Sequence, residues 1–217
     1  MINIDLICQN FPALLNGVVL TLHIAAISSC IGIVLGIILA FAQQVPFALV
    51  RWVVTAYITF TRGTPMFTQI LFAFYVLPQF GITFAPLSVA IIAIGLNSAC
   101  YVSQIVRSGI FSVSKGQKEA ARVLGFSGFQ IARYIVLPQA IRAVIPALGN
   151  EAITLVKDSS LASVIGVGEL SRQGSVIISR TYDAITIFAA MTMLYLLITS
   201  TISYIVAVVE RKMNIHA

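Results

Sequence analysis

Long apolar runs alternate with short polar segments along the 217-residue chain, and this alternation predicts a bundle of membrane-spanning helices. A helix needs roughly 20 apolar residues to cross a bilayer. Five runs reach this length, at residues 14–42, 53–77, 87–106, 135–156 and 185–209. The first run is overlong, so we expect it to tilt or to fray at one end. The pattern predicts an all-α, polytopic membrane protein that forms a single transmembrane domain over residues 1–217.

A polar segment at residues 114–138 interrupts the apolar pattern and contains two closely spaced helix starts. Each start has the spacing of a capping box: Ser114 with Gln117, and Ser127 with Gln130. Gly125 lies between them, and glycine often ends a helix in the left-handed conformation. We therefore expect a short helix near residues 115–124, a tight turn at Gly125, and a second helix from about Gly128. Pro138 should then kink that second helix.

Composition restricts the class of protein further. Apolar residues make up 59% of the chain and charged residues only 9%, which excludes a soluble domain of this size. The sequence contains no GxxxxGK[ST] phosphate loop, so the chain is not expected to bind ATP itself. The two histidines are far apart and the three cysteines form no CxxC pair, so we predict neither a metal site nor a cofactor.

The basic residues predict how the chain is oriented in the membrane. If the N-terminus faces outward, most lysines and arginines that flank the spans fall on the inner side: Arg51, Arg107, Lys115, Lys118, Arg122, Arg133, Arg211 and Lys212. The outer segment at residues 166–183 carries two arginines that are offset by two acids. This is a positive-inside excess, with the C-terminus and residues 114–138 in the cytoplasm. The net charge of +6 therefore reflects topology and does not indicate a nucleic-acid partner.

The polar segment also carries a family signature. Its fixed positions are Glu119, Ala120, Ala121, Gly125, Ile135, Leu137 and Pro138. With this EAA signature, the chain resembles the membrane subunits of ATP-binding-cassette importers. TRGTP at residues 61–65 and LVKDSS at residues 155–160 are similar to the polar amino acid branch of that family. The resemblance covers nearly the whole chain.

The resemblance implies a type I importer permease fold in a bacterial inner membrane. The loop at about residues 114–128 would hold a coupling helix that docks on a cytoplasmic ATPase subunit. A second permease subunit, identical or related, and an extracytoplasmic amino-acid-binding protein would complete the importer. The ATPase partner would hydrolyse ATP, so this chain would not be an enzyme. The sequence leaves open which amino acid is carried, and a permease for another small polar solute is the alternative.

Arg62 is the first candidate for the substrate path. It lies ten residues into the second predicted span, roughly 15 Å at 1.5 Å per residue, and so near the bilayer midplane. A cation at that depth needs a carboxylate partner or water. The Gly-Thr-Pro sequence at residues 63–65 should break the helix, as in the broken helices that line transporter cavities. Two interpretations remain open: a structural ion pair of Arg62 with Glu151 or Asp158, or substrate or gate contact near Thr64.

The third span contributes Asn97, Tyr101 and Gln104, which are spaced to project from one helix face. In hydrocarbon that face must look toward a cavity or a partner helix. In the resembled family this region commonly reads NSAAYxxE, and its amide and carboxylate contribute to substrate contact. Gln104 stands where the glutamate would be, so a strongly cationic substrate is less favoured. Hydrogen bonding between helices is the alternative role for all three residues.

The fourth predicted span is interrupted by Pro138 and Pro146 and ends in a polar cluster that includes Ser160. Lys157 is suited to pair with an α-carboxylate and Asp158 with an α-ammonium, the two groups that every amino acid carries. Alternatively, the two side chains neutralise each other at a helix end.

Two further features have competing interpretations. Gly32 and Gly36 form a GxxxG pattern that allows close helix approach, either within the chain or to a second membrane subunit. Residues 125–128 spell the GxSG of intramembrane serine proteases, but no histidine lies nearby to activate Ser127. A channel or assembly factor is the remaining class, and it would have no use for a coupling helix.

Overall fold

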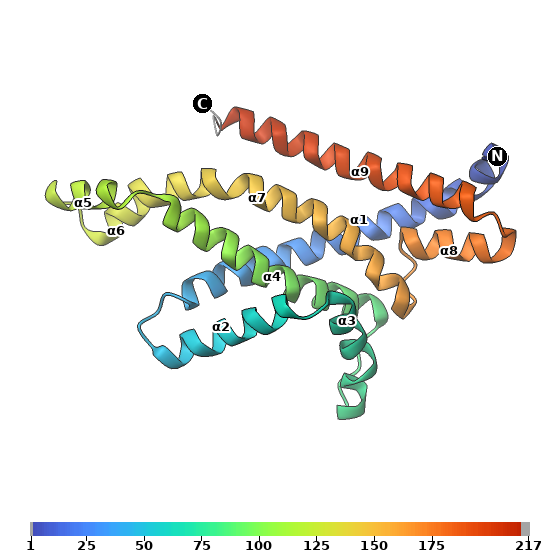
Figure 1. Cartoon of the computed structure of the whole chain (residues 1–217), viewed down its shortest axis with the longest axis horizontal. Coiled ribbons are helices and arrows are strands. Elements are labelled where there is room, and N and C mark those ends of the chain that lie inside the picture. Colours follow the sequence, from blue (N-terminus) through green and yellow to red (C-terminus); the bar gives the residue numbers. More distant parts are fainter. Residues whose placement is uncertain (1, 214–217) are drawn as a thin grey trace.

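The computed structural model describes residues 2–213, and its regular elements within that range are all helical (Figure 1). The all-α prediction is therefore confirmed. The elements in chain order are α1 Ile4–Ala42, α2 Ala48–Gly63, α3 Met66–Tyr75, a 3₁₀ turn Leu77–Phe80, α4 Pro86–Ser112, α5 Lys115–Val123, α6 Gly128–Gln130, a π-helical segment Ile131–Val136, α7 Leu137–Asp158, a 3₁₀ segment Ser159–Ile165, α8 Leu170–Thr181 and α9 Ala184–Lys212.

Four of the five predicted spans correspond to helical stretches that are long and apolar enough to cross a membrane. These stretches are Ile4–Ala42, Pro86–Ser112, Gly128–Ile165 and Ala184–Lys212. The second predicted span is not one continuous helix, because α2 and α3 are separated at Thr64 and Pro65. Thr64 has an extended backbone (φ −118°, ψ 146°), since the residue before a proline is disfavoured in the α conformation. The break itself was predicted, whereas an unbroken span at residues 53–77 was wrong.

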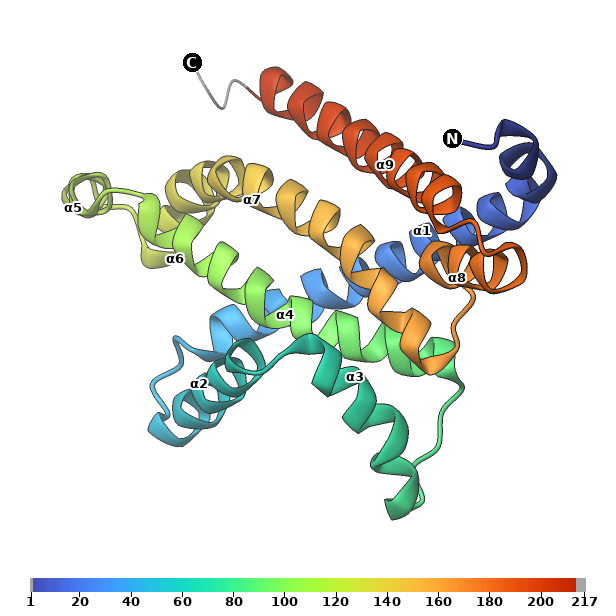
Figure 2. The same cartoon turned by 45° about the vertical axis from the view of Figure 1, so that its right-hand side comes forward.

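Helices α1 and α4 form the centre of the bundle, and small residues allow them to pack closely (Figure 2). Gly32 lies against Ser98, and Gly36 lies against Val102. A Cβ atom built on Gly32 would be 2.7 Å from Ser98 Oγ, and one on Gly36 would be 2.6 Å from Val102 Cβ. The GxxxG pattern therefore serves packing within the chain. Helix α7 packs on α4, and α9 packs on α7 (Figures 1 and 2).

Helix α8 lies at the end of the bundle near the N-terminus (Figure 1), and it begins at a buried acid, Glu169. Glu169 caps α8 by accepting hydrogen bonds from the backbone N–H groups of Ser171 and Arg172, at 2.9 and 2.8 Å. Its side chain also accepts a 2.9 Å bond from the Tyr195 hydroxyl on α9. Burial raises the pKa of Glu169, and these hydrogen bonds oppose that shift. The carboxyl group thus joins α8 to α9.

Helices α5 and α6 lie at the opposite end of the bundle (Figure 1). The predicted turn between them is confirmed: Gly125 has φ +81°, and Ser127 forms a complete capping box with Gln130. The predicted box at Ser114 is only half formed, because Ser114 caps the N–H of Gln117 without a bond in return. The Gln117 side chain instead accepts a 2.8 Å bond from Gln139 on α7.

The two prolines of the fourth span behave differently from the sequence prediction. The disturbance expected at Pro138 lies in the preceding residues Ile131–Val136, which are π-helical. Pro138 lacks the N–H that the carbonyl of residue 134 would accept in an α-helix, so the helix before it rearranges. Pro146, by contrast, lies inside the continuous helix α7, so the predicted interruption there is wrong. Proline is tolerated in spanning helices when other groups satisfy the freed carbonyl.

The close approach of α1 and α4 gives a first prediction. Replacing Gly36 with alanine should force the helices apart and lower stability by about 1–3 kcal/mol, the usual range for overpacking. The thermal midpoint of the purified protein in detergent measures this effect. Gly63→Ala is the matched control, because a Cβ at Gly63 meets no atom within 4 Å. Equal midpoints for the two variants would contradict the packing role of Gly36.

Candidate translocation site and coupling segment

The break between α2 and α3 is closed by the side chain of Gln69. Its Nε2 donates to the carbonyl oxygens of Thr61 and Thr64, at 2.8 and 3.2 Å, and contacts Thr64 Oγ1 at 2.7 Å. Its Oε1 accepts a 3.0 Å hydrogen bond from Asn97 Nδ2 on α4. Backbone carbonyls freed by the broken helix are thus satisfied within the protein, as the bilayer requires. The same side chain fixes the break against α4.

A polar pocket of about 330 Å³ lies beside this break, and we call it the acidic pocket. It is lined by Thr64, Met66, Asn97, Tyr101, Glu151, Thr154, Leu155 and Asp158. Glu151 and Asp158 are seven residues apart on α7, which places them two turns apart on one helix face. Glu151 Oε1 accepts a 2.6 Å hydrogen bond from Ser98 Oγ. The pocket offers two carboxyl groups, together with an amide and hydroxyls.

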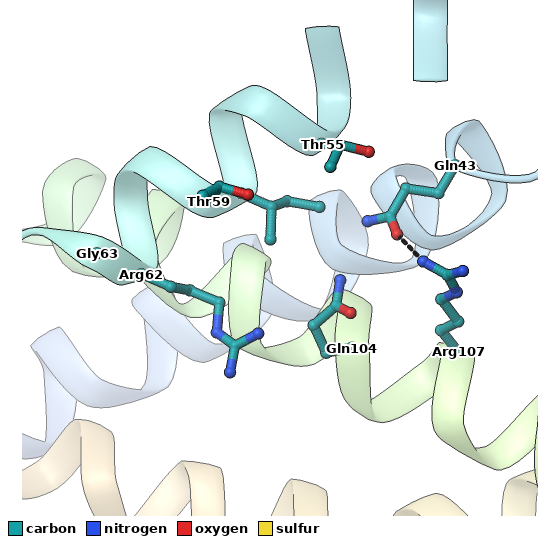
Figure 3. A pocket seen from close by; sticks show the side chains of 8 residues that line it. Gln43, Thr55, Thr59, Arg62, Gly63, Gln104 and Arg107 are labelled. Atoms are coloured by element: carbon teal, nitrogen blue, oxygen red, sulfur yellow. Dashed lines mark hydrogen bonds between the residues drawn. The ribbon is translucent and has the colours of Figure 1, made fainter. Parts of the chain in front are cut away.

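A second pocket, of about 340 Å³, lies between α2, α4 and the end of α1, and we call it the arginine pocket (Figure 3). It is lined by Gln43, Thr55, Ile58, Thr59, Arg62, Gly63, Gln104 and Arg107. Its charged residues are two arginines, without a carboxylate among the lining residues. Arg107 donates a hydrogen bond to the side-chain oxygen of Gln43 (Figure 3).

Arg62 and Tyr101 join the two pockets. The guanidinium carbon of Arg62 lies 5.2 Å from the centroid of the Tyr101 ring. Arg62 lines the arginine pocket and Tyr101 lines the acidic pocket, so this cation–π contact stands between them. Within the described residues, the structure does not contain the ion pair of Arg62 with Glu151 or Asp158 that the sequence left open.

The structure brings together most of the predicted substrate-path residues and separates two of them. Thr64, Asn97, Tyr101 and Asp158 line the acidic pocket, and Arg62 and Gln104 line the arginine pocket. Lys157 is exposed and Ser160 is half-buried, and neither lines either pocket. Gln104 does not line the acidic pocket, so its neutral side chain does not affect the charge of that pocket.

Sequence reasoning missed several residues that line or support the pockets. The sequence suggests Glu151 only as an ion-pair partner of Arg62, although its spacing from Asp158 places both on one helix face. Arg107 was counted only as a flanking charge, although it continues the stripe of Tyr101 and Gln104 at a spacing of three. Gln69 gave no signal, because its role depends on a break and a neighbouring helix that are distant in sequence.

The predicted coupling residues form an exposed surface at the end of the bundle. Glu119 and Ala120 are exposed on α5, whereas Ala121 is buried against the protein. Leu137 and Pro138, at the start of α7, are also exposed. Large apolar side chains lie in the same segment, with Val123, Leu124 and Phe129 between 76% and 88% exposed. The Ser127 hydroxyl serves as a helix cap, which accounts for this serine without any catalytic role.

The Gln69 contacts give a second prediction. Gln69→Glu keeps the size of the side chain but replaces two N–H donors by at most one O–H donor, so at least one of the carbonyls of Thr61 and Thr64 loses its partner. We expect a loss of about 1–3 kcal/mol, as for a buried acceptor left unsatisfied. Thermal unfolding in detergent measures this loss. Gln79→Glu, at an exposed position beyond α3, is the control, and equal midpoints for both variants would show that the break does not depend on Gln69.

Comparisons with known proteins identify the family of the chain. The chain is 37% identical over 206 residues to the glutamine transport system permease protein GlnP of Escherichia coli (strain K12), and the match covers 94% of each chain. It is 36% identical over 204 residues to the arginine transport system permease protein ArtQ of Bacillus subtilis (strain 168), covering 94% of this chain and 93% of that one.

A solved amino acid ABC transporter with histidines superposes with a TM-score of 0.93 at 33% identity, covering 98% of this chain and 99% of that one. The predicted type I importer permease fold is therefore confirmed. Residues 32–215 match the family described as binding-protein-dependent transport system inner membrane component. The resemblance drawn from the EAA signature is confirmed by these matches, and the chain belongs to this family of importer permeases.

Proposed function

We propose that this chain carries a polar amino acid across the inner membrane, as the permease subunit of an importer driven by a separate ATPase. One observation carries the proposal. A guanidinium, that of Arg62, lies against the ring of Tyr101, and that ring lines a pocket with the carboxyl groups of Glu151 and Asp158. The site thus presents opposite charges next to each other, as a zwitterion requires. Relatives whose names specify glutamine and arginine transport support this substrate class.

Each end of the substrate has a complementary group in this arrangement. Arg62 binds the α-carboxylate, since a guanidinium donates paired hydrogen bonds to a carboxylate. Asp158 and Glu151 accept hydrogen bonds from the α-ammonium group, and Asn97 adds a polar contact. Lys157, which the sequence suggested for the carboxylate, is exposed outside the pocket, so Arg62 takes that role. The chain itself makes and breaks no covalent bond.

Helix α5 acts as the coupling helix in this proposal. It is tied to the spans on both sides: Gln117 accepts a bond from Gln139 on α7, and Lys118 Nζ donates to the Ile110 carbonyl on α4 at 3.4 Å. A push on α5 by an ATPase subunit is thereby transmitted to α4 and α7, two of the helices that carry pocket residues. Alternating access follows when such movements open the polar centre to one side and then to the other.

The other partners and the orientation follow the same scheme. A second permease subunit, identical or related, lies beside this chain, and a binding protein delivers substrate from outside. The segment that includes α5 is rich in basic residues, so it lies in the cytoplasm. With this orientation the N-terminus faces outward and the C-terminal end faces the cytoplasm.

The substrate contacts give a third prediction. Asp158→Asn keeps the shape of the acidic pocket but removes a charge from the proposed ammonium site. We expect amino acid uptake by the assembled importer to fall roughly tenfold to a hundredfold, the range for a lost hydrogen bond to a charged group. Uptake into proteoliposomes measures this loss. Asp183→Asn, at the half-buried N-cap of α9 outside both pockets, should transport normally, and unimpaired uptake by Asp158→Asn would contradict the proposed site.

The coupling turn gives a fourth prediction. Gly125 has φ +81°, a conformation that disfavours residues with a side chain by about 1–2 kcal/mol, and a Cβ there meets no atom within 4 Å. Gly125→Ala should therefore distort the turn through its backbone alone, and uncouple ATP hydrolysis from uptake. Gly116→Ala is the control, because a Cβ at Gly116 also meets no atom within 4 Å but the residue has no positive φ. The ratio of amino acid imported to ATP hydrolysed should fall only for Gly125→Ala, and an unchanged ratio would contradict the coupling role.

A further inference from the structure

We infer that the arginine pocket is an anion site of its own, which binds a carboxylate on the α5 side of the Arg62–Tyr101 contact. Amino acids that leave the acidic pocket toward the cytoplasm would supply that carboxylate, and this source rests on the proposed function. The binding of an anion by the pocket does not rest on it, because it follows from the groups in the pocket.

Hydrogen-bond donors in this pocket exceed the acceptors available to them. Arg107 donates one bond, to the side-chain oxygen of Gln43 (Figure 3). The other side-chain atom of that amide, Gln43 Nε2, is buried and has no hydrogen-bond partner among the described residues. Arg62 contacts the face of an aromatic ring, which accepts no conventional hydrogen bond. Three groups therefore have donors to spare, and an anion is the ligand that satisfies them.

Charge leads to the same conclusion. Two guanidiniums line the pocket, and its lining residues include no carboxylate. Arginine is costly at membrane depth unless a counter-charge or water accompanies it. A carboxylate suits the pocket, because its two oxygens match the fork of guanidinium donors, and it is the anionic group that the proposed substrate class carries.

The residues that line the arginine pocket come mainly from two helices, α4 and α2. On α4, Tyr101, Gln104 and Arg107 succeed one another at a spacing of three, so each lies beside the next and the row turns by about 60° around the helix at each step. On α2, Thr59 and Arg62 lie three apart and face the same pocket (Figure 3). From Asn97 in the acidic pocket to Arg107 is ten residues of helix, or roughly 15 Å toward α5.

Arg62 borders both pockets, so it can contact a carboxylate in the acidic pocket and again in the arginine pocket. Its guanidinium lies over the ring of Tyr101, at the border of the acidic pocket, and it also lines the arginine pocket. A carboxylate held by Arg62 can exchange to Arg107 without leaving positive potential. The arginine pocket is thus a waypoint on the inward route.

Acetate is the probe for a direct test on the full-length chain purified in detergent. A ligand that binds only the folded state raises the thermal midpoint, and at ten times its Kd the rise for a chain of this size is roughly 3–6 °C. We expect this rise with sodium acetate, and a smaller one with sodium chloride or sodium sulfate at the same ionic strength. Equal rises with all three salts would overturn the carboxylate preference, and no rise with acetate would overturn the site.

Two variants locate the effect. Arg107→Gln removes one guanidinium and should abolish the acetate rise. Gln43→Glu places a carboxylate beside Arg107 within the protein, so it should fold at least as stably as the parent chain and yet lose the acetate rise. Arg51→Gln, an exposed cation at the start of α2 outside the pocket, is the control and should keep it. A full acetate rise in Gln43→Glu would overturn the assignment even if Arg107→Gln failed to fold.

The same variants separate this inference from the proposed transport function. Asp158→Asn changes only the acidic pocket, so it should keep the acetate rise while losing amino acid uptake. If the importer carried no amino acid but the acetate pattern held, the anion site would stand and the substrate class would fall. If uptake held but acetate raised the midpoint of Gln43→Glu and the parent chain equally, the anion site would fall alone.

Discussion

The hydrogen bonds of Gln69 across the gap between α2 and α3 are the interaction on which the polar centre of this protein depends. In the hydrocarbon of a bilayer no water is available to satisfy a backbone carbonyl, so a helix can break only where the protein or a water-filled cavity supplies the missing partners. Gln69 supplies them for Thr61 and Thr64, and Asn97 holds the same amide against α4. The break can therefore persist at depth, and it leaves α2 and α3 free to run in different directions (Figure 1).

Polar groups of opposite charge are separated along the centre of the bundle. Carboxyl groups from α7 line one pocket, arginines from α2 and α4 line the other, and the contact of Arg62 with Tyr101 stands between them. An aromatic ring is a suitable neighbour at such a border, because its face attracts a cation without neutralising it. Arg62 thus keeps its charge available for a ligand, which a buried ion pair with Asp158 would have prevented.

Local signals in the sequence predicted the fold well, whereas contacts between residues distant in the sequence could not be predicted from it. The turn at Gly125 and the break before Pro65 follow from residues that act on their own backbone, so both were predicted. Lys157 was misplaced because adjacent residues on a helix point about 100° apart, so it faces away when Asp158 faces the pocket. The orientation of α7 is set by its packing against α4, which the order of its residues does not reveal.

The π-helical segment Ile131–Val136 has a consequence for the geometry of α5 and α6. A π-helix accommodates more residues per turn than an α-helix, so this segment sets the angular phase between the cytoplasmic end and span α7. Six π-helical residues turn the chain by roughly as much as five α-helical residues, so converting this segment to ordinary α-helix with all six residues kept would rotate everything before it by about 100° about the α7 axis. The exposed face of α5 would then point elsewhere, with each helix intact. The π-helical segment thus determines the direction in which the exposed face of α5 points relative to α7.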